Sequence, residues 1–341
     1  MLLARIIHYL VFLTVMGLLT ACKPEQQQLN GNTMGTYYSI KYIASSSVPK
    51  PKKIQQGVDE KLEHINQLMS TYRSGAEISQ FNSSLKTNQP FVISSEMMTV
   101  IQEATRIHEI TEGGLDITVG LLVNLWGFGP VNKTGFVPPS EADIKSRLAV
   151  TGMDKLQVTQ DAVIKKVPEL YLDLSAIAKG YGVDYVAHYL ESLGINNYLV
   201  DIGGEVRAKG KNLQGKLWRI AIEKPTTDMT QEVERVIELD NMSVATSGNY
   251  RNYFDADGVR YSHTIDPKTG YPIRNNVLSV TVLTPECMTA DGLATGFTVL
   301  GLEKSLAIAN RLNIAIFMLS EEDGKIVAHY SEAFGPYLTE K

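Results

Sequence analysis

Predicted helices and strands come in clusters along this chain, and this order restricts its fold more than any other feature. Strict alternation of strand and helix would favour a parallel sheet, whereas clustering favours an α+β fold of layered mixed or antiparallel sheets with flanking helices. From apolar periodicity, we expect helices at residues 54–69, from a Ser94-Ser95 cap onward, at 175–193, and at 289–312 with a break at Gly301. Strands are expected at residues 36–43, 158–167, 170–174 and 198–206, several times between 217 and 283, and at 314–319 and 325–330. Hairpin turns are expected at Asp257-Gly258 and at Glu322-Asp323-Gly324.

The first residues have the pattern of an export signal. Arg5 and His8 flank an apolar run at residues 10–19, which is shorter than the roughly 20 residues needed to span a bilayer. Small residues precede Cys22, as a lipoprotein signal peptidase requires. Residues 1–21 are therefore interpreted as a lipoprotein signal peptide, and Cys22 as the lipidated residue that anchors the exported protein to a membrane. The alternative is an ordinary signal peptide in which Cys22 is incidental.

The cysteine count bears on how the rest of the chain is stabilised. The sequence has two cysteines, and if Cys22 carries a lipid, Cys287 has no intramolecular partner. Neither a disulfide nor a cysteine-based zinc site is then expected, so stability must come from a packed core. Residues 22–31 are polar and without periodicity, which predicts a short tether, and residues 32–341 form the folded domain.

Charge and motifs argue against several classes of function. The formal net charge is −5, and no long run of lysine or arginine is present, so nucleic acid is not expected as a partner. The chain also lacks G-x-G-x-x-G, G-x-x-x-x-G-K-[ST], H-E-x-x-H and G-x-S-x-G. A dinucleotide site would have to be built in another way.

The segment from Thr289 to Thr295 is the strongest single candidate for a metal site. If Thr289 caps a helix, Asp291 and Thr295 stand four residues apart on one face, roughly 5–6 Å apart at Cβ. A carboxylate and a hydroxyl are hard oxygen ligands, and Mg²⁺ prefers few such ligands together with substrate phosphates. In the alternative interpretation, Asp291 only complements the helix dipole and Thr295 is a surface hydroxyl.

A second candidate lies between Tyr171 and Gly180. Asp173 ends an apolar strand, a helix follows, and Lys179 stands near its first turn. Helix N-termini favour anions, and Asp173 could accept a hydrogen bond from a heterocycle. Alternatively, Asp173 or Ser175 is a helix cap and Lys179 is solvated.

His263 is the candidate general base. It stands where a predicted strand meets the turn-forming run Asp266-Pro267-Lys268-Thr269-Gly270, and a histidine can deprotonate a hydroxyl near neutral pH. A lone histidine is also compatible with a structural role. Weaker candidates for holding a ring or a phosphate are the segments 69–74, 115–129 and 247–251.

Taken together, in this order and spacing, these segments resemble the ApbE family of FAD:protein FMN transferases. The resemblance extends from about residue 32 to 340. The matching runs are Thr33-Met34-Gly35-Thr36, Met69-Ser70-Thr71-Tyr72, Leu115 to Gly129, Asp173 to Gly180, Val200-Asp201-Ile202-Gly203-Gly204, Ser247-Gly248-Asn249-Tyr250-Arg251, His263-Thr264-Ile265-Asp266-Pro267 and Asp291 to Thr295.

The resemblance implies an ApbE-like, T-fold-related architecture with FAD in a cleft. It implies Mg²⁺ held by the Asp291 carboxylate, the Thr295 hydroxyl and the backbone carbonyl of Ala176, and His263 as the catalytic base. FAD contacts are implied at Met34, Tyr72, Arg73, Ser74, Gly114, Leu115, Asp116, Asp173, Lys179 and Thr264. The chain departs from the expected pattern at Gly292, where an alanine is expected and where glycine would loosen the start of the helix.

The same resemblance implies the reaction and its partners. FMN is transferred from FAD to a threonine or serine hydroxyl, and AMP leaves. The acceptors are exported or membrane-bound redox subunits with a Ser/Thr-Gly-Ala motif, which agrees with a lipid-anchored enzyme facing the periplasm, on either the inner or the outer membrane. Two alternatives remain: an FAD pyrophosphatase that releases free FMN, and a non-catalytic periplasmic FAD-binding lipoprotein.

Overall fold

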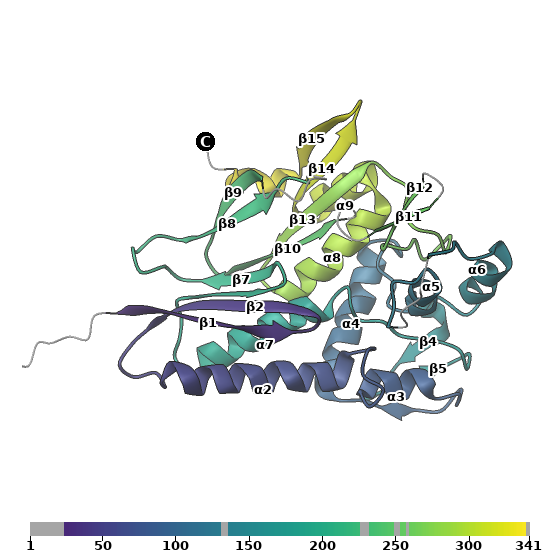
Figure 1. The fold of residues 1–341 in the computed structure, drawn as a ribbon, viewed down its shortest axis with the longest axis horizontal. Helices are drawn as coiled ribbons and strands as arrows, with labels where there is room; N and C mark the ends of the chain where they lie inside the picture. The colour runs from purple at the N-terminus through teal and green to yellow at the C-terminus, as the bar shows by residue number, and fades with distance from the viewer. Residues whose placement is uncertain (1–23, 131–135, 226–231, 249–252, 257–258, 339–341) are drawn as a thin grey trace, which may run out of the picture.

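The computed structural model describes residues 24–130, 136–225, 232–248, 253–256 and 259–338 (Figure 1). Its centre is an eight-stranded sheet in the order β1-β2-β6-β7-β10-β13-β14-β15. Neighbouring strands in this sheet pair antiparallel throughout. The strands are β1 (Glu25–Thr33), β2 (Thr36–Ala44), β6 (Tyr198–Ile202), β7 (Glu205–Lys209), β10 (Met242–Gly248), β13 (Val277–Thr284), β14 (Ala315–Glu322) and β15 (Lys325–Tyr330).

Helices cover one side of this sheet in two layers. Helices α7 (Ala178–Ser192) and α8 (Cys287–Leu300) pack directly on the strands, and α2 (Pro51–Met69) and α4 (Ser95–Ile110) pack on α7 and α8 (Figure 1). The shorter helices are α3 (Glu77–Ser83), α5 (Gly120–Leu125), α6 (Glu141–Leu148) and α9 (Leu302–Leu312), with 3-10 turns at Met153–Lys155 and Glu332–Tyr337. The predicted α+β class with flanking helices is therefore confirmed.

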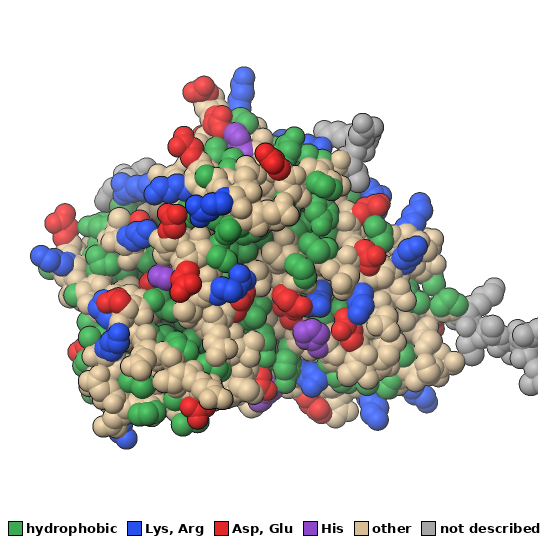
Figure 2. Space-filling view, turned by 180° about the vertical axis from the view of Figure 1, so that it is seen from behind, with side chains coloured by type: hydrophobic (Ala, Val, Ile, Leu, Met, Phe, Trp, Pro, Cys, Tyr) green, Lys and Arg blue, Asp and Glu red, His purple; other side chains and the backbone are tan. Residues whose placement is uncertain are grey.

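Three small antiparallel sheets complete the fold. They are β3 (Phe91–Val92) with β5 (Ala162–Lys165) and β4 (Leu156–Val158), β8 (Trp218–Glu223) with β9 (Val233–Leu239), and β11 (Tyr253–Ala256) with β12 (Val259–Ser262). The turn predicted at Asp257-Gly258 lies outside the described residues, but the strands on either side of it pair as a hairpin would require. Acidic and basic side chains are interspersed over the face shown in Figure 2.

The N-terminal tether predicted at residues 22–31 is not what the structure contains from Glu25 onward. Residues Glu25–Thr33 form strand β1, which pairs along its whole length with β2. Met34 and Gly35 have φ values of 49° and 73°, which suit a two-residue hairpin turn. The strand is polar because it lies at the edge of the sheet, so only two of its side chains are buried, Leu29 and Thr33.

Several other predicted boundaries need correction. Residues 170–174 do not form a strand; the segment is held instead by hydrogen bonds such as that from the Asp173 amide to the Ile117 carbonyl, 2.8 Å. The single strand predicted at 198–206 is a hairpin of β6 and β7, because Gly203 and Gly204 adopt φ values of 63° and 104°. Helix α8 begins before Thr289, which is not its cap.

Cys22 and the predicted signal peptide lie outside the described residues. Among the helices of the described part, none combines the length and the apolar character that a membrane crossing requires.

Candidate active site

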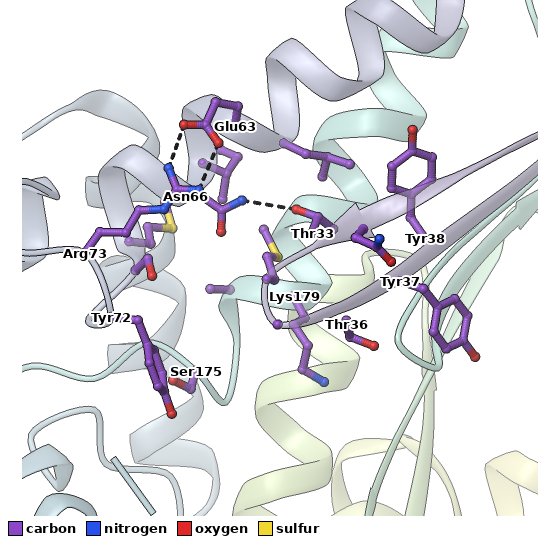
Figure 3. A pocket seen from close by; sticks show the side chains of 18 of the residues that line it. Thr33, Thr36, Tyr37, Tyr38, Glu63, Asn66, Tyr72, Arg73, Ser175 and Lys179 are labelled. Carbon is purple, nitrogen blue, oxygen red and sulfur yellow. Dashed lines mark hydrogen bonds and ion pairs between the residues drawn. The ribbon is translucent and has the colours of Figure 1, made fainter. Parts of the chain in front are cut away.

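Two connected cavities lie where α2, α7 and α8 approach the sheet. The outer cleft has a volume of about 1300 Å³ and the inner cavity about 430 Å³. Thr71, Tyr72, Ser175 and Lys179 line both, so the two spaces meet at these residues. Figure 3 shows Tyr72 and Ser175 at one end of the outer cleft, with the Lys179 side chain drawn between Ser175 and Thr36.

The hairpin of β1 and β2 and the end of α2 form the outer cleft. Met34, at the hairpin turn, and Tyr72, after α2, both line it. Tyr72 is 67% exposed. Its hydroxyl donates a hydrogen bond of 3.5 Å to the Phe128 carbonyl, and this bond links the segment after α2 to Phe128. An exposed ring at the rim is suited to stacking against a flat heterocycle.

The Arg73 guanidinium is less available to contact FAD than its place in the sequence suggests. Its guanidinium donates two hydrogen bonds to the Glu63 carboxylate, at 2.6 and 2.9 Å (Figure 3). The same hydrogen bonds lower the pKa of Glu63 and raise the pKa of Arg73. Arg73 lines the outer cleft, whereas Ser74 is exposed and lies outside the linings of both cavities.

Asp291, Thr295 and Ala176 all line the inner cavity, as the predicted metal site requires. Asp291 and Thr295 lie one turn apart on α8, and the turn containing Ala176 precedes α7. Oδ2 of Asp291 accepts a hydrogen bond of 2.9 Å from the Gly180 amide. The Asp291 side chain is buried, and burial raises the pKa of its carboxyl against the opposing effects of Lys179 and of Gly180.

A buried carboxylate from α7 fixes the start of α8. Oδ1 of Asp184 accepts from the Cys287 amide at 2.9 Å, and Oδ2 accepts from the Met288 amide at 2.8 Å. Asp184 also accepts from the Arg207 guanidinium at 2.8 Å. The helix that carries Asp291 and Thr295 is thus capped by a residue far away in the sequence.

Sequence reasoning missed Glu205, the first residue of β7. Its carboxylate forms an ion pair of 2.5 Å with the Lys179 ammonium, and 5% of the Glu205 side chain is exposed compared with 31% for Lys179. Burial raises the pKa of Glu205 to about 7, and the charges of Asp291 and Glu205 outweigh burial to raise the pKa of Lys179. The run Glu-Val-Arg-Ala-Lys carries three charged residues, and no apolar alternation singles out Glu205 among them, so the only local signal was its place directly after Gly203-Gly204.

His263 follows β12 directly and lines the inner cavity, as does Thr264. The Phe128 ring meets the His263 ring edge-on, with centroids 6.2 Å apart, and also stacks on Phe254 at 4.7 Å. The Thr264 amide donates to the Ser262 hydroxyl at 3.2 Å, and the Thr264 carbonyl accepts from Ile273. The histidine therefore lies between an aromatic wall and a backbone held by local hydrogen bonds.

The remaining predicted FAD contacts also meet at the inner cavity. Gly114, Leu115, Asp116 and Asp173 line it. Asp116 accepts from the Thr118 amide at 2.8 Å, and Asp173 accepts from the Ser175 amide at 2.8 Å. Both carboxylates are therefore held by backbone hydrogen bonds. Of segment 247–251, Ser247 and Gly248 line the cavity, while Asn249, Tyr250 and Arg251 lie outside the described residues.

The predicted Mg²⁺ ligands are the Asp291 carboxylate, the Thr295 hydroxyl and the Ala176 carbonyl. Among the described residues, no cluster of three or more histidine, cysteine, aspartate or glutamate side chains is placed to bind a metal. Oδ2 of Asp291 accepts from Gly180, so Oδ1 is not used by that bond, and both Asp291 and Thr295 line the same cavity. One carboxylate, one hydroxyl and one carbonyl fit Mg²⁺, which keeps most of its other ligands as water or substrate phosphate.

Comparison with known proteins identifies the family of this chain. A sequence model of the ApbE family matches residues 34–318. A Vibrio cholerae protein named FAD:protein FMN transferase is 50% identical over 334 residues, which cover 97% of this chain and 99% of that protein. The solved structure of flavin transferase ApbE from Vibrio cholerae has a TM-score of 0.87 at 49% identity and covers 92% of this chain and 100% of that one. The apo form of Pseudomonas stutzeri flavinyl transferase ApbE gives 0.85 at 38% identity, with 92% and 97% covered. This chain therefore belongs to the ApbE family.

Proposed function

We propose that this enzyme transfers the FMN moiety of FAD to a threonine or serine hydroxyl of another protein and releases AMP. The observation that carries the proposal is the buried Asp291 carboxylate in a cavity that joins a larger cleft at Lys179. Relatives of this chain, 50% and 46% identical to it, bear the name FAD:protein FMN transferase.

The shape of the cleft suits a dinucleotide. FAD has two ring systems joined through a diphosphate, and two cavities that meet at one point offer a compartment for each. Tyr72 would lie against the flavin, and Lys179 at the junction would face the diphosphate. Fixed positive charge at this place favours the negative charge that grows on phosphate oxygens as the bond between them breaks.

Asp291, Thr295 and the carbonyl of Ala176 would hold Mg²⁺. When bound, the ion supplies positive charge to the diphosphate oxygens. The protein's own contribution is geometric: Gly180 orients the Asp291 carboxylate, and Asp184 fixes the helix on which it stands. Few protein ligands leave room for phosphate oxygens.

His263 supplies the base. Its imidazole accepts the proton from the acceptor hydroxyl as that oxygen bonds to the FMN phosphorus. The bond between this phosphorus and the bridging oxygen breaks, and the oxygen leaves with AMP. The product is an FMN phosphoester on the acceptor side chain.

The N-terminal pattern supports a proposal for the location, and the family resemblance supports one for the partners. We infer a lipid on Cys22 that holds the enzyme on a membrane facing the periplasm. The acceptors would be exported or membrane-bound redox subunits with a Ser/Thr-Gly-Ala motif.

One assay separates the transferase from the two alternatives. The enzyme is incubated with FAD, MgCl₂ and an acceptor protein that carries the motif. We expect flavin fluorescence on the acceptor that survives denaturation, because the linkage is covalent. Free FMN in place of labelled acceptor would indicate a pyrophosphatase, and unchanged FAD would indicate a binding protein.

A further inference from the structure

The ion pair between Glu205 and Lys179 lies beside the proposed metal site. Glu205 contributes to the wall of the inner cavity together with Asp291 and Thr295. Within the described part of the chain, Lys179 forms its ion pair with Glu205, at 2.5 Å, and not with Asp291. The charge of Asp291 nevertheless acts on Lys179. One ammonium group therefore has two buried carboxylates within its electrostatic reach.

Glu205 is costly to bury and is incompletely satisfied. Its Oε2 atom is buried and has no hydrogen-bond partner among the described residues. Burying a carboxylate carries a desolvation penalty of several kcal/mol, which the attraction of one ion pair only partly offsets. A neutral side chain would fill the same position on β7 without that penalty, so a role beyond packing is indicated.

We propose that Glu205 is a positioning residue that holds the Lys179 ammonium away from Asp291 and thereby keeps the Asp291 carboxylate available for Mg²⁺. This inference rests on the proposed function. Without Glu205, Asp291 is the remaining buried carboxylate whose charge acts on Lys179, and the Lys179 ammonium would compete with the incoming Mg²⁺ for it. With Glu205, the lysine stays at the junction of the two cavities, where the diphosphate is proposed to lie.

The test measures Mg²⁺ binding without FAD and without turnover. The thermal unfolding midpoint is followed as MgCl₂ is raised. A ligand at free concentration L that binds only the native state stabilises it by RT ln(1 + L/Kd), so a weaker site needs proportionally more ligand for the same rise. The variants are Glu205→Gln, Lys179→Met and the double variant. Glu191→Gln is the matched control, because Glu191 and Lys209 form another ion pair between α7 and β7, at 3.0 Å, outside both cavity linings.

We expect Glu205→Gln to need about tenfold more MgCl₂ for the same rise in midpoint, as when a partner of a metal ligand is lost. Lys179→Met should bind Mg²⁺ as well as the wild type or better. The double variant should behave like Lys179→Met, because the competing ammonium is gone. The control should match the wild type.

The outcomes distinguish this inference from the proposed function. An unchanged Mg²⁺ response in Glu205→Gln, or a double variant as weak as Glu205→Gln, overturns the inference. Weaker Mg²⁺ binding by Lys179→Met also overturns it, and this variant remains informative if Glu205→Gln does not fold. If Asp291→Asn keeps the full response to Mg²⁺, the proposed metal site itself is wrong.

Discussion

The backbone amide of Gly180 donates a 2.9 Å hydrogen bond to Oδ2 of Asp291 and so joins α7 to the proposed metal site on α8. The two residues are 111 positions apart in sequence. The contact uses one carboxylate oxygen and sets the direction of the other. It also requires the two helices to approach closely, which only glycine at position 180 permits.

The first prediction concerns this close approach. A Cβ added at Gly180 would lie 2.4 Å from the Cys287 carbonyl oxygen and 2.8 Å from Cβ of Asp291. Gly180→Ala must therefore separate the helices, and we expect a loss of about 1–3 kcal/mol of stability together with loss of transfer activity. Chemical denaturation and the FAD transfer assay measure both. Gly335→Ala, where nothing lies within 4 Å of the added Cβ, is the control.

The second prediction tests the metal ligands on α8. Thr295→Val should raise the MgCl₂ concentration required for half-maximal transfer by about tenfold or more, because the hydroxyl oxygen is removed from the inner cavity. Thr298→Val removes a hydroxyl from the same helix that instead donates to the Ala294 carbonyl at 2.8 Å. Its Mg²⁺ requirement should be unchanged. Equal behaviour of the two variants would contradict the assignment of Thr295.

The third prediction concerns proton transfer. His263→Ala should slow FMN transfer by roughly a hundredfold to ten-thousandfold, the usual contribution of a positioned base. FAD affinity, measured by the quenching of flavin fluorescence, should change little, since the other residues lining the cavity remain. A variant that loses FAD binding and activity in parallel would show that His263 acts as a binding residue instead.

The fourth prediction concerns Gly292, where the family resemblance leads to the expectation of alanine. Gly292 lies inside α8 and is buried, so it does not loosen the helix start. A Cβ there would approach Cδ1 of Ile107 at 2.7 Å. Gly292→Ala should gain about 1 kcal/mol in helix propensity but lose a similar amount by displacing Ile107. Adding Ile107→Val should make the double variant more stable than Ile107→Val alone, measured by denaturant unfolding in a double-mutant cycle.

The fifth prediction is a pH dependence far from the cleft. The Lys165 ammonium donates to the carbonyls of Asn82, Ser84 and Pro168 in a buried position, and burial lowers its pKa to about 8 from 10.5. Between about pH 8 and 10.5 the unfolded chain binds more protons at Lys165 than the folded chain does. Lys165 therefore makes the free energy of unfolding rise as pH increases from about 8 to about 10.5. Lys165→Met should be less stable at pH 7 and should lack this rise. Parallel stability curves for both proteins from pH 7 to 10.5 would refute the prediction.

Local sequence patterns were sufficient to predict much of the fold. The helix predicted from a Ser94-Ser95 cap begins at Ser95, and the Ser94 hydroxyl accepts from the Met97 amide. The turn predicted at Glu322-Asp323-Gly324 has φ values of 49° and 72° at Asp323 and Gly324. Both features depend on a few neighbouring residues whose side chains or backbone freedom decide the conformation.

The sequence was less informative where contacts between segments far apart in the chain determine the conformation. Strand β1 has little apolar character of its own and is a strand because β2 supplies its hydrogen bonds. Asp184 caps α8 from another helix, and Glu205 pairs with Lys179 from another strand. The residues predicted to bind FAD or metal or to act as the base line the two cavities, apart from Ser74, but their chemical roles stay predictions until the variants are measured.

If Cys22 carries a lipid as proposed, the early start of β1 would limit how far the enzyme can move from the membrane. Glu25 belongs to the folded body, three residues after Cys22. A fully extended chain covers at most about 3.5 Å per residue, so the linker between a lipidated Cys22 and Glu25 would reach only about 10 Å. The body would then rest almost against the bilayer, and a target protein would have to present its threonine or serine close to the lipid headgroups in order to be flavinylated.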